Sequence, residues 1–105
     1  MASFDPQVLA RQTGGDAALE REVLAMFLSQ ATDDYSRLAA AGPSDAGDIA
    51  HRIKGAARAI GAEDVASAAA RIEVAGTETI AMARLRSEID TACREISRYL
   101  ASGEE

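Results

Sequence analysis

The sequence predicts an all-α protein, an antiparallel four-helix bundle of up-down-up-down topology with a short capping helix at its N-terminus. Three observations lead to this fold class. The 105 residues are rich in alanine and only 4% aromatic, and alanine is the strongest helix former. Apolar residues recur at spacings of three, four and seven, without strand-like alternation. Glycine and proline divide the chain into five helical segments with short connections, which favour antiparallel neighbours.

The first helix is short and is expected over about residues 5–13. Phe4-Asp5-Pro6 is typical of a staple residue, an N-cap and a first helical position. Leu9 is placed to pack against the phenylalanine. Thr13-Gly14-Gly15 then ends the helix, and we interpret the glycine pair as a turn between helices.

The second helix is expected over about residues 16–41. Asp16 is its N-cap, and Gly42-Pro43 ends it because proline disfavours helical geometry in the residue before it. Its apolar positions predict one buried face. These positions are Leu19, Val23, Met26, Phe27, Ala31 and Leu38.

The other helices are expected over about residues 45–60, 63–75 and 77–101, with a frayed tail at 102–105 and one domain over the whole chain. Ser44 or Asp45 begins the third helix, whereas Gly61 and Gly76 end the third and the fourth. The predicted inward positions are Ile49, Ile53, Ala56 and Ile60, then Val65, Ala69 and Ile72, and finally Ile80, Leu85, Ile89, Ala92, Ile96, Tyr99 and Leu100.

The composition excludes several classes of function. A net charge of -6 disfavours binding to a nucleic-acid backbone. The sequence contains no apolar run long enough to span a bilayer and no signal-peptide pattern, so we expect a cytoplasmic protein. Cys93 lies among apolar residues and is interpreted as a small buried side chain. One cysteine and one histidine cannot complete a zinc site, and the paired Glu-x-x-His motifs of di-iron bundles are missing.

The only histidine, His51, is expected on an exposed face of the third helix. Helical geometry places it beside Lys54, Gly55 and Arg58, on a strip about 170° from the predicted inward face. We call these four residues the His51 strip. A buried structural histidine is therefore not expected here, although an ordinary solvated polar face remains an alternative.

Three features of this region favour a functional surface. Residues 49–62 contain no acidic side chain, and Arg52, Lys54 and Arg58 give them a local positive charge. Gly55 lies in the middle of a helix, where glycine costs about 1 kcal/mol relative to alanine. An open approach to His51 for a bulky partner would account for that cost. A neutral imidazole is a nucleophile, and the neighbouring cations could neutralise phosphoryl oxygens.

The stretch AHRIKGAARAIGA at residues 50–62 resembles the signature of histidine-containing phosphotransfer (HPt) domains. That signature is roughly His-x-Leu/Ile-Lys-Gly-Ser/Ala-Ala/Ser, followed by a Leu/Ile-Gly pair. The likeness continues in the short first helix, the Gly-Asp step into the long second helix, and Ile72-Glu73 on the fourth. The residues that match the signature are His51, Ile53, Lys54, Gly55, Ala56, Ile60 and Gly61.

The resemblance implies roles for individual residues. His51 would accept a phosphoryl group at Nε2, and Lys54 would stabilise its oxygens. Glu73 matches the position whose side chain hydrogen-bonds Nδ1, although its spacing from His51 also fits a solvated surface glutamate. Gly55 would allow close approach of a partner, and Arg52 and Arg58 would help to bind it.

The resemblance also implies partners. We expect a free-standing, monomeric protein of a bacterial-type multistep phosphorelay, which carries phosphate between aspartates of response-regulator receiver domains and works with a hybrid sensor histidine kinase. It needs no cofactor of its own, since the receiver supplies Mg²⁺. We expect a phosphocarrier and not an enzyme, because His51 itself would be modified and then discharged by a partner. The sequence contains no ATP-binding or autokinase motif, so we do not expect the protein to phosphorylate itself. Arg52 and Ala56 stand where dimerising histidine kinase domains carry an acidic residue and a proline. The alternative is a helical adaptor that binds a signalling partner through the same face without phosphoryl chemistry.

Overall fold

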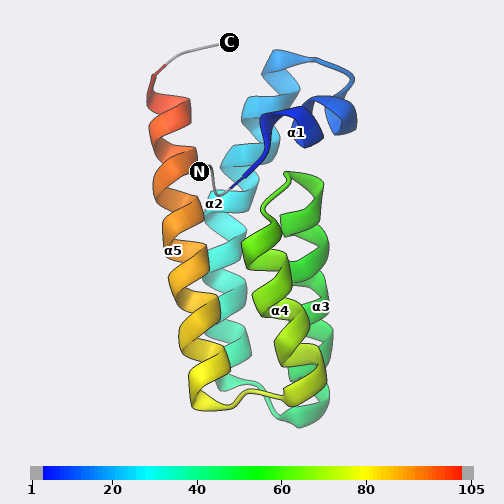
Figure 1. The fold of residues 1–105 in the computed structure, drawn as a ribbon, viewed down its shortest axis with the longest axis vertical. Coiled ribbons are helices and arrows are strands. Elements are labelled where there is room, and N and C mark those ends of the chain that lie inside the picture. The colour runs from blue at the N-terminus through cyan, green and yellow to red at the C-terminus, as the bar shows by residue number, and fades with distance from the viewer. Residues whose placement is uncertain (1–3, 103–105) are drawn as a thin grey trace.

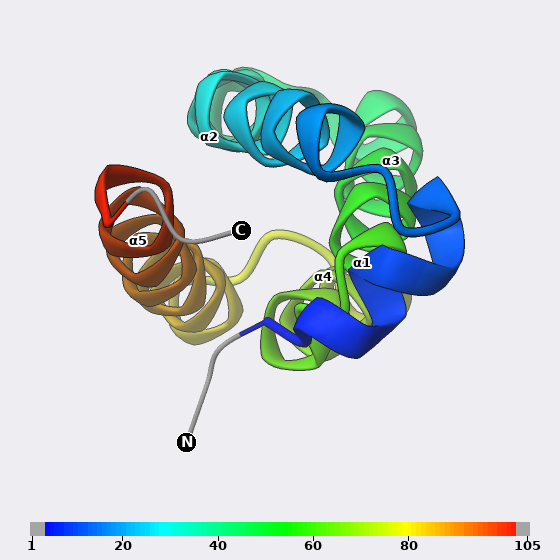
Figure 2. The ribbon, with the colours of Figure 1, turned by 90° about the horizontal axis from the view of Figure 1, so that it is seen from above.

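The computed structural model describes residues 4–102, and these fold into five helices with no β-strand among them. The four longer helices lie side by side along the longest axis of the molecule, and the short one lies at one end (Figure 1). Figure 2 looks along this axis and shows the four longer helices around a common interior. The helices are α1 (Pro6–Thr13), α2 (Ala17–Ala40), α3 (Pro43–Ala59), α4 (Glu63–Ala75) and α5 (Thr79–Ala101). Most of the tail that we expected to fray, residues 103–105, lies outside the described residues.

The first two helices begin at the predicted caps. Asp5 accepts a hydrogen bond from the backbone N–H of Gln7 at 2.9 Å, and Asp16 accepts one from that of Leu19 at 3.1 Å. Each bond satisfies a donor that the helix itself leaves unpaired.

The third helix begins earlier than predicted. Gly42 is its N-cap and Pro43 its first residue, so the expectation that Ser44 or Asp45 begins the helix is wrong. Proline ends α2 and also suits the first turn of α3, where no backbone N–H is required.

The N-terminal segment closes one end of the molecule. The backbone N–H of Asp5 donates to the carbonyl oxygen of Ile60 at 3.2 Å, and the ring of Phe4 meets that of Tyr99 edge-on at a centroid distance of 5.5 Å. Gly61 connects α3 to α4 with a φ of 74°, and a Cβ there would lie 2.6 Å from the Cβ of Asp5. Only glycine combines this backbone conformation with so close an approach.

The core differs from the predicted inward faces on three helices. Leu19 and Met26 on α2 are 40% and 56% exposed, and Ile80 on α5 is 78% exposed. Ala56 on α3 is also exposed. The largest fully buried side chains are Leu9, Leu24, Leu38, Ile53, Ile60, Ile72, Leu85, Ile96 and Val65.

The rotation of α3 about its own axis explains why Ala56 is exposed and not buried as predicted. Its contact with α4 is the most extensive between any two helices, and alanine side chains allow the two backbones to approach closely. Ala50 and Ala57 of α3 and Ala69 of α4 are completely buried. The buried side of α3 thus consists of Ala46, Ala50, Ile53 and Ala57, and Ala56 is turned towards solvent.

Two further observations concern earlier expectations. Cys93 is half-buried and packs against the core, and burial raises the pKa of its thiol. Among residues 4–102, no helix has both the length and the apolar character needed to cross a membrane.

Candidate functional site

His51 lies on the exposed side of α3, and its side chain is 71% accessible. The buried residues Ala46, Ala50, Ile53 and Ala57 define the core-facing side of this helix. At 100° per residue, the His51 strip is centred about 120° from that side and not opposite to it. One flank of the strip therefore faces α4.

Glu73 extends from α4 to the imidazole. Its Oε2 lies 2.9 Å from Nδ1 of His51, so Glu73 is not a freely solvated side chain. An ionised carboxylate can only accept a hydrogen bond. In the neutral form of the imidazole, Nδ1 of His51 is therefore the nitrogen that carries the proton, and Nε2 is the unprotonated one.

Lys54 also contacts Glu73. Its Nζ lies 2.6 Å from Oε1, the other carboxylate oxygen, and its side chain is only 18% accessible. We expected Lys54 to be fully exposed with the rest of the strip, and this expectation is wrong. The rotation of α3 places position 54 on the flank that faces α4, where the side chain is covered. His51, Lys54 and Glu73 form one hydrogen-bonded group, which we call the His51 cluster.

The cluster keeps Glu73 ionised. The hydrogen bond from Lys54 lowers the pKa of the Glu73 carboxyl below its ordinary value, and the hydrogen bond from His51 lowers it further. Both partners stabilise the charged form of the acid. The site thus places a fixed negative charge on the Nδ1 side of the imidazole.

The other residues of the region are arranged differently. Arg52 is directed towards α2, where its guanidinium lies 3.3 Å from Oδ1 of Asp34. The Arg58 side chain is exposed and makes no hydrogen bond or ion pair with any residue in the range 4–102. Gly55 is exposed, and a Cβ built there meets nothing within 4 Å. The structure therefore leaves open space beside His51 that no other part of the described chain occupies.

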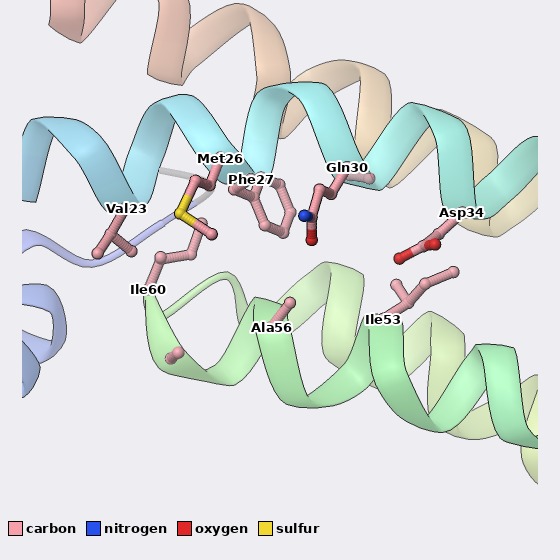
Figure 3. Close-up of a pocket in the computed structure, with 10 residues that line it drawn as sticks. Val23, Met26, Phe27, Gln30, Asp34, Ile53, Ala56 and Ile60 are labelled. Carbon is pink, nitrogen blue, oxygen red and sulfur yellow. The ribbon is translucent and has the colours of Figure 1, made fainter.

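A groove with mainly apolar walls runs between α2 and α3 (Figure 3), and its α3 wall includes Ala56, which follows Gly55 of the His51 strip in the sequence. Met26 of α2 extends towards Ile60 of α3, and Gln30 and Asp34 of α2 point across towards α3. Sequence reasoning placed Met26 and Ala56 in the core and did not identify Gln30 or Asp34. We call this the α2–α3 groove, and it is lined by Val23, Met26, Phe27, Gln30, Ala31, Asp34, Ile53, Ala56, Ala59 and Ile60.

Comparison with protein families gives one finding, a match of residues 22–100 to the family model described as Hpt domain. The matched segment contains α3, α4, most of α2 and nearly all of α5. Comparison with the curated proteins and with the solved structures gives no match.

Proposed function

Because the chain belongs to the Hpt domain family, we propose that it is a histidine phosphotransfer protein of a multistep phosphorelay. It carries a phosphoryl group on His51 between aspartates of receiver domains. The observation that supports this proposal best is the exposed imidazole with Nδ1 bound to Glu73 at 2.9 Å. In that arrangement Nδ1 is held by Glu73, and Nε2, the nucleophilic nitrogen, is available to a partner. Hpt domains are phosphocarriers, so the histidine itself is modified and then discharged.

The transfer step follows from this geometry. The lone pair of Nε2 attacks the phosphorus of an aspartyl phosphate in a receiver, and an N–P bond forms. The P–O bond to the aspartate breaks, and its electron pair leaves with the carboxylate. Positive charge develops on the imidazole ring, which keeps its proton at Nδ1. The ionised Glu73 is hydrogen-bonded to that side of the ring and stabilises this charge.

The cations of the region assist the transferred group. Lys54 lies one turn along α3 from His51, so that its ammonium can approach phosphoryl oxygens on the ring. Arg58 lies a further turn along the same face and has no ion pair within residues 4–102. Arg52 contacts Asp34, which lines the α2–α3 groove, and from this position it steers an acidic receiver surface towards His51.

The receiver docks over three adjoining features of the surface. These are the exposed imidazole, the open space at Gly55 and the α2–α3 groove with its exposed Met26. An apolar groove beside a charged strip is typical of a modest interface with an apolar centre and a polar rim. Such a complex is transient, as a carrier that must exchange partners requires.

The proposal includes the setting of the reaction. The scaffold is an up-down-up-down bundle of α2 to α5 with α1 as its cap, and the protein acts as a cytoplasmic monomer. Its partners are response-regulator receivers and a hybrid sensor histidine kinase. The protein contributes no cofactor, and Mg²⁺ belongs to the receiver.

Phosphate uptake tests the proposal directly. The protein is mixed with a panel of receiver domains from the same organism, each phosphorylated on its aspartate. We expect at least one receiver to transfer acid-labile, base-stable phosphate to the wild-type chain and none to His51→Gln, because glutamine lacks a nucleophilic nitrogen. Binding of a receiver without any phosphate uptake would show the adaptor function instead and contradict the proposal.

A further inference from the structure

The inference concerns the role of Lys54 before any phosphoryl group is present, and it rests on the proposed function. Lys54 is the only lysine of the chain, since the other ten of the 11 basic residues are arginines. Its ammonium is bound to Oε1 of Glu73 at 2.6 Å, and its side chain is 18% accessible. In the unphosphorylated protein, the positive charge of Lys54 is therefore paired with the carboxylate of Glu73.

Glu73 makes two contacts, one with each carboxylate oxygen. Oε1 binds Lys54, and Oε2 accepts the hydrogen bond from His51. A carboxylate held at one oxygen only can still turn about its side-chain torsions, and the side chain of Glu73 is 23% accessible to water. The second contact removes this freedom and leaves Oε2 directed at the ring.

The choice of lysine fits this arrangement. A guanidinium is a planar fork that binds both oxygens of a carboxylate at once. An arginine at position 54 would compete with His51 for Oε2 of Glu73. An ammonium is a point charge that can occupy one oxygen and leave the other free.

We propose that Lys54 is a positioning residue for His51 and acts through Glu73. By holding Oε1 of Glu73, it keeps Oε2 as the acceptor for the Nδ1 proton of His51. The neutral ring is thereby held in the tautomer whose Nε2 is unprotonated and nucleophilic. Lys54 has this role in the unphosphorylated protein, in addition to any contact with phosphoryl oxygens after transfer.

The test measures the ring tautomer of His51 in the unphosphorylated protein. Ring ¹⁵N chemical shifts of the neutral imidazole report the ratio of the Nδ1–H to the Nε2–H form, and the lone histidine makes the spectrum unambiguous. We expect Lys54→Met to lower this ratio by about threefold, because the hydrogen bond between His51 and Glu73 loses its fixed acceptor. Methionine keeps the apolar stem and removes the charge.

Two control variants separate this role from other effects. Arg58→Met removes a cation from the same strip without touching Glu73, and we expect it to leave the ratio unchanged. Glu73→Ala removes the acceptor, so that adding Lys54→Met to it should cause no further change. Helical content and thermal unfolding of each variant show that the fold is intact.

Two results would overturn the proposal. One is an unchanged tautomer ratio in Lys54→Met. The other is an equal fall in the presence and in the absence of Glu73, which would mean that Lys54 acts on the ring directly. The experiment uses no receiver and no phosphate donor. It can therefore succeed or fail independently of the phosphotransfer function.

Discussion

At the scale of single residues, Gly55 is the clearest sign of a partner. It lies in the middle of α3, and a Cβ at this position would meet nothing within 4 Å. Packing within residues 4–102 therefore does not require glycine here, and the backbone is ordinary helix without a positive φ. A mid-helix glycine has a cost to the fold. We therefore expect that glycine at this position favours the binding of another molecule, which would approach the open space beside His51.

Gly55→Ala tests this reading. We expect the variant to be more stable by about 1 kcal/mol, since alanine has the higher helix propensity, and to accept phosphate from a receiver more slowly, since the methyl group lies under the docked partner. Chemical denaturation and the rate of transfer from the receiver measure the two effects. Phosphoramidate, a small donor that needs no docking surface, should phosphorylate both proteins equally fast. Equal transfer rates from the receiver would contradict the assignment.

At the scale of helices, the apolar residues wrongly assigned to the core are informative. Met26 of α2 and Ala56 of α3 were predicted to be buried, yet both are exposed and line the α2–α3 groove. Each helix carries more apolar surface than its own core packing uses. Part of this excess, Met26 of α2 and Ala56 of α3, lies in the same groove, where Ala56 follows Gly55 of the His51 strip. An apolar surface of this kind marks an interaction site.

Met26→Glu should weaken binding of a receiver by about fivefold or more, because a charge replaces an apolar contact in the centre of the interface. Its effect on unfolding should be small, since the side chain is 56% exposed. Ile80→Glu is the matched control, because Ile80 is 78% exposed but lies on α5, outside the groove. Binding can be measured by titration calorimetry. Equal losses in the two variants would rule out the groove as the docking surface.

At the scale of the whole molecule, the corner formed by Asp5 and Gly61 joins the N-terminal segment to the turn between α3 and α4. The hydrogen bond from Asp5 to Ile60 and the close approach of Asp5 to Gly61 hold this end together. Both helices of the His51 cluster, α3 and α4, meet at this turn. The corner is far along α3 from His51, so it supports the scaffold and not the chemistry.

Gly61→Ala should destabilise the protein by about 2 kcal/mol, because alanine is strained at a positive φ and its methyl group collides with Asp5. Gly14→Ala is the matched control, since Gly14 has a similar φ of 67° but open space around it. We expect a smaller loss there, from backbone strain alone. Thermal unfolding measures both variants, and equal losses would show that the contact with Asp5 contributes nothing.

The sequence by itself determined what depends on neighbours along the chain. The caps at Asp5 and Asp16, the break at Gly42-Pro43 and the exposure of His51 all follow from local geometry and helical periodicity. The signature around His51 also lies within one helix, and the match to the Hpt family model agrees with it.

Only the tertiary structure decided which side chains meet across helices. Glu73 is separated from His51 by 22 positions, and Arg52 meets Asp34 on another helix. The covering of Lys54 and the exposure of Met26 likewise depend on how α2, α3 and α4 are rotated against one another. Periodicity gives the direction of a side chain about its own helix axis. It does not give the rotation of that helix in the bundle, because this rotation depends on how the helix packs against its neighbours, and α3 has its most extensive contact with α4.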